Sequence, residues 1–489
     1  MTTNHGGTRR ARAGGRWLGL GLLAFLSATL GGAPQALAEV DPLDRVQLHR
    51  NANRGVPYLP LARAGAEAGD PRLVMRAATT IELDGDPLEN VYSALRPIDV
   101  DGDGAFEFVQ FNGTRFVQVW SASGRKLWRI DNPGGYVHLM EKGTHRDTAA
   151  VLDLDGDGGQ DLAHCWERDG RRGLVYRRGR DGAVIRSVPL GPGNGECHMA
   201  AFRVEGRDEP LLLVAGTSGG AGRGGGGCAH DWVGYWAHTE AYDLAQKRLW
   251  ERDTCEAGHH AWPVDADGDG RAEAVFVGKY RLRPEDGRLD CTLADWPRGD
   301  HVDGLAVADL DPGRPGLEAL AVGQSGGGLY DAASCRPIWR LPSSMLRNPQ
   351  HLAAARLDAG SSAPLVAIDE RGTEAGARTV LVTGQGRLVA ATRQSFMPIQ
   401  NANLDGALGV DELVGSFGEV LDRHGNLRLD RSWYWHLQGA KVPKGRPGPY
   451  PKTFDRWQAF PLVFDQDGDG RDEIVTWGQS LIVVGKVVE

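Results

Sequence analysis

The sequence predicts an all-β protein that folds as a single β-propeller, with eight blades favoured and seven as the alternative. Three observations support this prediction. An acidic turn recurs along the chain, short apolar segments surround each copy, and 69 glycines and 26 prolines among 489 residues suit a turn-rich protein. Repeats of several short strands with a period of about 50 residues are typical of propellers, because each repeat forms one blade.

The clearest acidic turn is DADGDGRAEAVF, which begins at Asp265. One Ca²⁺ can be surrounded by oxygen ligands from this turn: carboxylates at positions 1, 3 and 5, a backbone carbonyl at position 7 and an acid at position 9. Glycine at position 6 permits the sharp turn that this requires. Apolar, strand-like segments flank the turn instead of helices, which excludes an EF-hand. We therefore expect several structural calcium sites in turns that join the first and second strands of a blade. The expected ligands are Asp99, Asp101, Asp103, Glu107, Asp153, Asp155, Asp157, Asp161, Asp265, Asp267, Asp269, Glu273, Asp465, Asp467, Asp469 and Glu473.

Degenerate copies of the turn fill the gaps between these four and start at Arg203, Asp309, Arg356 and Asn403. They lack one or more ligands, so we interpret them as plain turns. Together the turns recur at intervals of 44 to 62 residues, and hairpins such as AYDLAQKRLW complete each unit. The last unit contains three apolar strands, and we expect residues 72–84 to pair with it as a fourth strand and so remove the open edge.

The first 38 residues have the organisation of a secretory signal peptide. Arginines at positions 9, 10, 12 and 16 precede an apolar run from Leu18 to Leu30, and Ala36-Leu37-Ala38 forms a small-residue cleavage site. The apolar run is too short for a permanent membrane span. We expect a secreted or periplasmic monomer without a membrane span after signal cleavage, with a coil extension at 39–71 and the propeller at 72–489.

Six cysteines in an exported protein predict disulfide bonds. Their positions in the repeats suggest that Cys165 pairs with Cys197, Cys228 with Cys255, and Cys291 with Cys335. The alternative is a zinc site that uses Cys228, Cys255 and nearby histidines, although no CxxC spacing supports it.

Histidines gather where the first strands of successive repeats begin. In a propeller these positions surround the channel mouth on the face opposite the acidic turns. Each histidine alone is explained by a hydrogen-bonded cap, but five successive units favour proton transfer at this mouth. The histidines are His145, His198, His259, His260, His301 and His351. Loops expected on the same face add His164, Arg223, Tyr235, Lys279 and Tyr280.

A long segment between the last two units adds aromatic rings and positive charge to this face, although the whole chain has a net charge of −9. Its candidate substrate-binding residues are Trp433, Trp435, Lys441 and Arg446. Sugar rings stack on aromatic side chains and carboxylates pair with cations, so the segment suits an acidic polysaccharide. The alternative is a solvated surface loop. A nucleic-acid partner is not expected for an exported, acidic protein.

The DxDGDGxxE turns, the YDxxxxxxLW hairpins and the segment HVDGLAVADLDPGRPGLE, from His301 to Glu318, resemble propeller polysaccharide lyases. This family includes rhamnogalacturonan, ulvan and rhamnose-glucuronate lyases, and the resemblance covers residues 90–489 as repeat architecture. It implies β-elimination at a uronic acid. That reaction requires a cation beside the carboxylate, a base that takes the C5 proton, and an acid that protonates the leaving oxygen.

The resemblance implies roles for the residues of the histidine-rich face. Arg223 or Lys279 is expected to pair with the substrate carboxylate. His198 or His260 is expected to act as the base, with His164 and His301 in reserve. Tyr235 or Tyr280 is expected to act as the acid. The remaining candidates, expected to contact substrate, are His145, His259, His351, Trp433, Trp435, Lys441 and Arg446.

Two other functions fit the same architecture. Calcium-binding FG-GAP or VCBS-type repeats also form adhesion propellers that bind a glycan or protein and catalyse nothing, but such a propeller does not require a ring of histidines. A glycoside hydrolase requires a pair of carboxylates on the histidine-rich face. Only Asp147, Asp231 and Asp303 are expected there, without a convincing pair. We therefore favour a polysaccharide lyase.

Overall fold

The first strand described in the computed structural model of the chain begins at Val74. The structure describes residues 73–84, 90, 93–112, 115–133, 149–168, 171–190, 195–218, 238–258, 260–297, 299–358, 361, 363–371, 377–392, 395–406, 410–415, 418–429, 461–478 and 481–488. The expected signal peptide and coil extension lie outside these residues and stay predictions. Among the described residues, no helix has the length and apolarity needed to cross a bilayer.

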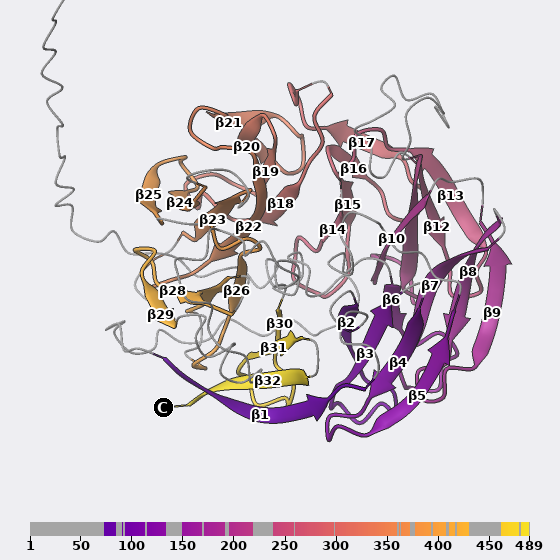
Figure 1. Cartoon of the computed structure of the whole chain (residues 1–489). Helices are drawn as coiled ribbons and strands as arrows, with labels where there is room; N and C mark the ends of the chain where they lie inside the picture. Colours follow the sequence, from indigo (N-terminus) through magenta and orange to yellow (C-terminus); the bar gives the residue numbers. More distant parts are fainter. Residues whose placement is uncertain are drawn as a thin grey trace, which may run out of the picture. The chain divides into compact units, whose positions relative to one another are not determined.

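The described strands form eight antiparallel sheets of four strands each, which confirms the eight-blade prediction and shows that the seven-blade alternative is wrong (Figure 1). Blades 1 and 2 contain β2 (Ala94–Ile98), β3 (Glu107–Asn112), β4 (Phe116–Trp120), β5 (Lys126–Asp131), β6 (Ala149–Leu152), β7 (Asp161–Arg168), β8 (Arg171–Arg177) and β9 (Val184–Pro189). Blades 3 and 4 contain β10 (Gly195–Phe202), β11 (Leu211–Ser218), β12 (His238–Tyr242), β13 (Arg248–Asp253), β14 (Ala261–Val264), β15 (Ala274–Val277), β16 (Tyr280–Leu282) and β17 (Leu289–Thr292).

The second half of the ring repeats this arrangement. Blades 5 and 6 contain β18 (Gly304–Ala308), β19 (Glu318–Gly323), β20 (Gly326–Asp331), β21 (Pro337–Pro342), β22 (Pro349–Ala355), β23 (Leu365–Glu370), β24 (Thr379–Thr383) and β25 (Leu388–Ala391). Blades 7 and 8 contain β26 (Gln400–Ala402), β27 (Glu412–Val414), β28 (Val420–Leu421), β29 (Leu427–Leu429), β30 (Leu462–Phe464), β31 (Glu473–Trp477), β32 (Leu481–Val488) and β1 (Val74–Glu82).

The two ends of the described chain share blade 8. β1 pairs antiparallel with β32, from Val74 opposite Val488 to Glu82 opposite Leu481, and the strand order is β1-β32-β31-β30. In Figure 1 the indigo β1 runs beside the yellow β32. The N-terminal segment therefore supplies the fourth strand, as the sequence predicts. Its hydrogen bonds cover the edge that β32 would otherwise expose.

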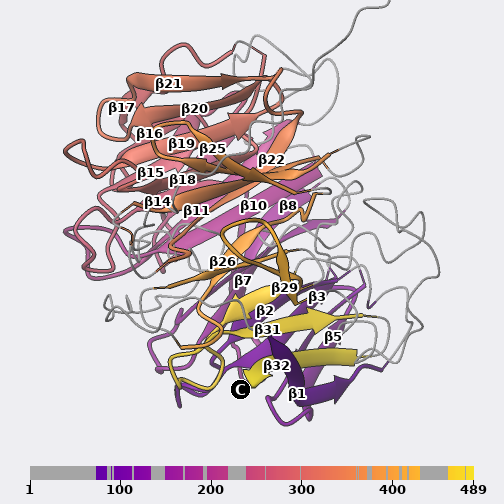
Figure 2. The same ribbon diagram turned by 90° about the vertical axis from the view of Figure 1, so that its left-hand side faces the viewer.

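Apolar side chains fill the spaces between neighbouring blades. Inner strands are buried on both faces, so strands such as β18 (GLAVA) are continuously apolar. Outer strands such as β9 alternate between half-buried and exposed positions. Trp262 and Tyr330 pack between blades 4 and 5, while Phe108 and Trp477 pack between blades 1 and 8 and close the ring. Figure 2 shows these sheets from the side.

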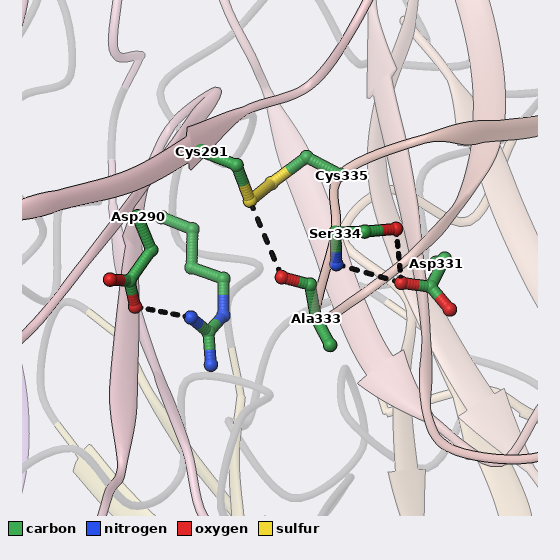
Figure 3. The surroundings of a disulfide bond; sticks show 7 residues. Asp290, Cys291, Asp331, Ala333, Ser334 and Cys335 are labelled. Carbon is green, nitrogen blue, oxygen red and sulfur yellow. Dashed lines mark hydrogen bonds and ion pairs between the residues drawn. A yellow bond between two sulfur atoms is a disulfide. The ribbon is translucent and has the colours of Figure 1, made fainter.

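One predicted disulfide bond is confirmed. Cys291 of β17 is bonded to Cys335, which follows β20, and the bond joins blades 4 and 5 (Figure 3). Cys335 lies in a tight turn, and its backbone N–H donates to the Asp331 carbonyl oxygen at 2.8 Å. Cys165 and Cys255 are also disulfide-bonded. Their predicted partners, Cys197 and Cys228, have side chains outside the described set. A disulfide sulfur is not a thiolate ligand, so Cys255 does not fit the zinc alternative.

Candidate functional site

The four acidic turns share one hydrogen-bond pattern that directs their carboxylates inward. In blade 4 the two oxygens of Asp265 accept hydrogen bonds from the N–H groups of Gly268 and Gly270, both at 2.7 Å. Glu273 accepts one from Ala266 N–H at 2.6 Å. Ligand atoms of Asp265, Asp267, Asp269 and Glu273 all lie within 4.8 Å of one another. Smaller groups with the same spacing occur at Asp99, Asp101 and Glu107, at Asp153, Asp155 and Asp161, and at Asp465, Asp467 and Glu473.

These groups fit a calcium ion to different degrees. Desolvation, together with neighbouring carboxylates, raises the pKa of Asp265 and of Glu273, and a bound cation would relieve this repulsion. In blade 8 the Lys486 ammonium already lies 2.8 Å from Asp467 and 3.1 Å from Glu473. Those contacts outweigh desolvation and raise the pKa of Lys486. Calcium therefore stays a proposal, which the residues of blade 4 support better than those of blade 8.

The degenerate turns keep the same fold without the ligand set. Glu318 accepts a hydrogen bond from Leu310 N–H, and Glu412 accepts one from Leu404 N–H, both at 3.0 Å. Neighbouring turns also hydrogen-bond to each other, as Asp472 N–H does to the Asn403 carbonyl oxygen at 2.7 Å. The last acid of the motif thus stabilises the turn itself, a role that the ligand pattern did not reveal.

Four of the predicted histidines at the mouth lie in the described residues. His260 and His301 shortly precede the first strands of blades 4 and 5, and His198 and His351 lie within the first strands of blades 3 and 6. His198 is buried in β10, on the strand face that it shares with Ala200 and Phe202. His260 is 8% exposed and its ring centroid lies 5.6 Å from that of Trp262, edge to face. His260 thus directly precedes its first strand, whereas His198 lies in the middle of its own.

His301 forms the best defined polar contact at the mouth. Its Nε2 lies 2.9 Å from Asp303 Oδ1, and Gln350 Nε2 donates to the other oxygen of Asp303 at 3.3 Å. Burial alone would lower the pKa of His301, but the charge and hydrogen bond of Asp303, with a smaller effect from Asp300, outweigh it and raise the pKa. The result is an oriented imidazole of increased basicity beside two buried carboxylates.

His351 contacts a second buried acid. Its Nδ1 lies 3.6 Å from Asp369 Oδ1, and its backbone N–H donates to the same oxygen at 3.0 Å. The other oxygen of Asp369 accepts a hydrogen bond from Ile399 N–H, which links blades 6 and 7. Desolvation raises the pKa of Asp369. Asp369 therefore ties together the starts of two neighbouring blades.

Lys279 and Tyr280 lie at the turn between the second and third strands of blade 4, and both have internal partners. Lys279 Nζ lies 2.6 Å from Glu256 Oε2. The Tyr280 hydroxyl donates to the Cys255 carbonyl oxygen at 2.9 Å, and desolvation, with Glu256, raises the pKa of Tyr280 to about 12. Gly258, two residues after Glu256, packs directly on the backbone of Val302, and Gly278, next to Lys279, packs on the backbone of Ala257. The segment that carries Glu256 therefore lies between Lys279 and the segment of His301.

His164 does not lie in a loop of this face, which corrects the prediction. It lies within β7, fully buried, with its ring 5.3 Å from that of Phe111. Its Nδ1–H donates to the Cys165 carbonyl oxygen at 2.9 Å, and its Nε2 accepts a hydrogen bond from Arg177 Nε at 3.0 Å. Desolvation lowers the pKa of His164 to about 3, so the imidazole is neutral. The strand continues to Arg168, and His164 is a buried packing residue within it.

Several sequence candidates lie outside the described residues. They are His145, Arg223, Tyr235, His259, Trp433, Trp435, Lys441 and Arg446. Sequence reasoning also missed Glu256, Asp300 and Asp369, which surround the described candidates. Glu256 has a backbone φ of 59°, uncommon for a residue with a side chain, but no local sequence signal marked it.

A search against protein-family models finds no match. Among curated proteins, the chain is 26% identical to rhamnogalacturonan endolyase YesW and 25% identical to rhamnogalacturonan exolyase YesX, both of Bacillus subtilis. The alignments cover 49% of this chain in each case, and 46% and 47% of the relatives. The chain is similar to rhamnogalacturonan lyases. It spans about half the length of the curated relatives it matches.

Solved structures agree on the fold. The structure of rhamnogalacturonan lyase YesW matches with a TM-score of 0.55 and 20% identity, over 85% of this chain and 76% of that one. The Vibrio cholerae biofilm matrix protein Bap1 matches with a TM-score of 0.51 and 11% identity, over 88% and 90%. At these identities the structures support the propeller alone. The sequence matches confirm the resemblance to propeller-type polysaccharide lyases.

Proposed function

We propose that this protein is a secreted polysaccharide lyase that cleaves an acidic, pectin-like glycan by β-elimination. The relatives' names specify rhamnogalacturonan as substrate and lyase as reaction class. The same scaffold carries the polar groups that such a reaction uses, around the starts of the first strands of blades 4 and 5. The export signal at residues 1–38 is the basis for proposing secretion.

The observation that carries the proposal is the His301–Asp303 pair, with 2.9 Å between Nε2 and Oδ1. A β-elimination begins when a base removes the C5 proton of the uronate. Electrons of the broken C–H bond then form the C4–C5 double bond, and the bond from C4 to the leaving oxygen breaks. Asp303 increases the basicity of His301, as a general base for this proton requires. His198 and His260 stay alternative bases on the neighbouring blades.

The developing charge requires a cation, and the leaving oxygen requires a proton. Lys279 is the described candidate for the cation. The ion pair with Glu256 holds the Lys279 ammonium in place, and the Lys279 side chain is 13% exposed. A substrate carboxylate would have to share the ammonium with Glu256 or displace Glu256. Tyr280 keeps its proton near neutral pH because its pKa is raised, so its hydroxyl can donate to the leaving oxygen after it releases the Cys255 carbonyl. Calcium is proposed as a structural ion of the acidic turns, on the opposite face.

The variant pair His301→Gln and Asp303→Asn tests this assignment on rhamnogalacturonan and other uronate polysaccharides. We expect loss of ultraviolet-absorbing unsaturated product with little change in melting temperature. A comparable change at His351→Gln, whose histidine pairs with a different acid, serves as the matched control and should retain more activity. If His301→Gln retains full activity, the base is another group. If the wild type only binds the glycans, the adhesion alternative replaces the lyase.

A further inference from the structure

A cavity of about 410 Å³ lies between blades 1 and 2. Ile130 and Asn132 of blade 1 line one side, and Trp166, Val175, Arg177 and Ser187 of blade 2 line the other. The strands concerned, β5 and β7 to β9, are labelled on the right-hand side of Figure 1. A cavity of this volume accommodates a small ligand such as one or two sugar rings.

Trp166 is a half-buried wall of this cavity and is held in place. It lies opposite Gly173 in the β7–β8 pair, and a Cβ on Gly173 would be 2.2 Å from the indole Nε1. Only glycine therefore lets the indole lie across the neighbouring strand. The indole N–H donates to Ser187 Oγ at 3.2 Å, which fixes its orientation. A fixed aromatic face beside a cavity suits the stacking of a sugar ring.

Arg177 brings a positive charge to the same cavity. Its Nε donates to His164 Nε2 at 3.0 Å and its Nη1 to the Gly182 carbonyl oxygen at 3.1 Å. Both acceptors are neutral, since His164 is kept uncharged by burial. Within the described part of the chain no carboxylate forms an ion pair with Arg177. Desolvation lowers the pKa of Arg177 without a compensating acid. A partly buried guanidinium in this situation favours an anionic ligand.

We propose that this cavity is an ancillary binding site for one uronic-acid residue of an acidic glycan. The sugar ring stacks on Trp166, its carboxylate pairs with Arg177, and its hydroxyl groups reach Asn132 and Ser187. The choice of a uronate among anionic sugars rests on the proposed function. The site itself does not, because it lies between blades 1 and 2, whereas the proposed catalytic groups belong to blades 4 and 5. Such a site would hold the enzyme on its polymer.

Galacturonic acid is the probe, with galactose as the neutral control. As a monosaccharide, galacturonic acid has no glycosidic leaving group at C4, so binding is measured without elimination. Saturation-transfer NMR and calorimetric titration of the full chain should show binding of the uronate at least fivefold tighter than that of galactose. We expect Trp166→Ala to weaken binding about tenfold and Trp166→Phe to retain most of it, because a smaller ring still stacks.

Two arginine variants separate a specific ion pair from a general effect of charge. Arg177→Gln should lose the part of uronate binding that depends on Trp166. The matched control is Arg180→Gln on the same blade, whose exposed side chain pairs with Asp157 at 3.3 Å, and it should bind like the wild type. Because Arg177 also holds His164, the melting temperature of each variant is measured alongside.

Equal affinity of the wild type for both sugars would overturn the proposal, even if Arg177→Gln proves unfolded. Unchanged uronate binding by folded Trp166→Ala would overturn it as well. Uronate binding that depends on Trp166, in a protein that cleaves no polysaccharide, would support this site and contradict the proposed lyase function instead.

Discussion

Gly258→Ala is expected to disturb the contact between blades 4 and 5 at the proposed active site. Gly258 lies between Glu256 and His260 and has a φ of +95°. A Cβ at this position would be 1.8 Å from the Val302 carbonyl oxygen and 2.9 Å from its carbon. The neighbouring atoms are backbone, so the segment that leads into β18 must shift to relieve the clash.

The magnitude follows from two costs. A left-handed conformation costs an alanine about 1–2 kcal/mol. Overpacking of a tight contact costs a further 1–3 kcal/mol or so, which gives about 2–5 kcal/mol in total. Gly316 supplies a matched control, because its φ is +92° and a Cβ there would meet nothing within 4 Å. Gly316→Ala should therefore lose only the conformational part, about 1–2 kcal/mol.

Urea unfolding of both variants, at a fixed calcium concentration and followed by circular dichroism, measures the two free-energy changes. Lyase activity measured in parallel should fall further in Gly258→Ala, because His301 and Asp303 lie on the displaced segment that leads into β18. Free-energy changes that agree within about 0.5 kcal/mol would refute the argument, since additional packing strain would then be absent.

Three further predictions concern other parts of the molecule. Lys486→Met should add one calcium site in a calorimetric titration of chelator-treated protein, because the ammonium no longer competes in blade 8; an unchanged stoichiometry would contradict this. Replacing Cys291 and Cys335 by serine should lower the free energy of unfolding, measured in urea, by about 4 kcal/mol, because the bond closes a loop with a sequence separation of 44 residues. A decrease below about 1 kcal/mol would contradict this explanation by chain entropy. Asp303→Asn removes the carboxylate that raises the pKa of its histidine partner, so the acidic limb of the kcat/KM profile should move to lower pH while the maximum falls. An unmoved limb would show that this histidine is not the titrating base.

The architecture was predictable from the sequence because each blade repeats the same short-range signals. The four acidic turns and their four degenerate copies mark the junction of first and second strands in each blade. The incomplete last unit indicates that the segment now seen as β1 closes the ring. The Cys291–Cys335 bond followed from the position of each cysteine in its repeat. Tyr176 and Tyr242, which lie in the repeated hairpins, are buried.

The proposed site was less predictable, because it depends on contacts between segments far apart in the chain. Asp303 accepts a hydrogen bond from Gln350, 47 residues away, and Glu256 pairs with Lys279 across a turn. The sequence placed His164 in a loop because the end of a strand has no clear sequence signal. In the structure β7 extends to Arg168, so His164 lies inside the strand and is buried. Arg177 contacts His164, and the sequence does not show that, among the described residues, Arg177 pairs with no carboxylate.

The most direct test of the central claim is the ultraviolet absorbance of unsaturated uronate, followed while the protein starting at Glu39 acts on a panel of uronate polysaccharides that includes rhamnogalacturonan. The account predicts a rise in absorbance on at least one uronate polysaccharide and none on a neutral glycan. No rise on any member of the panel, together with retained binding to one of them, would contradict the lyase and identify a binding propeller.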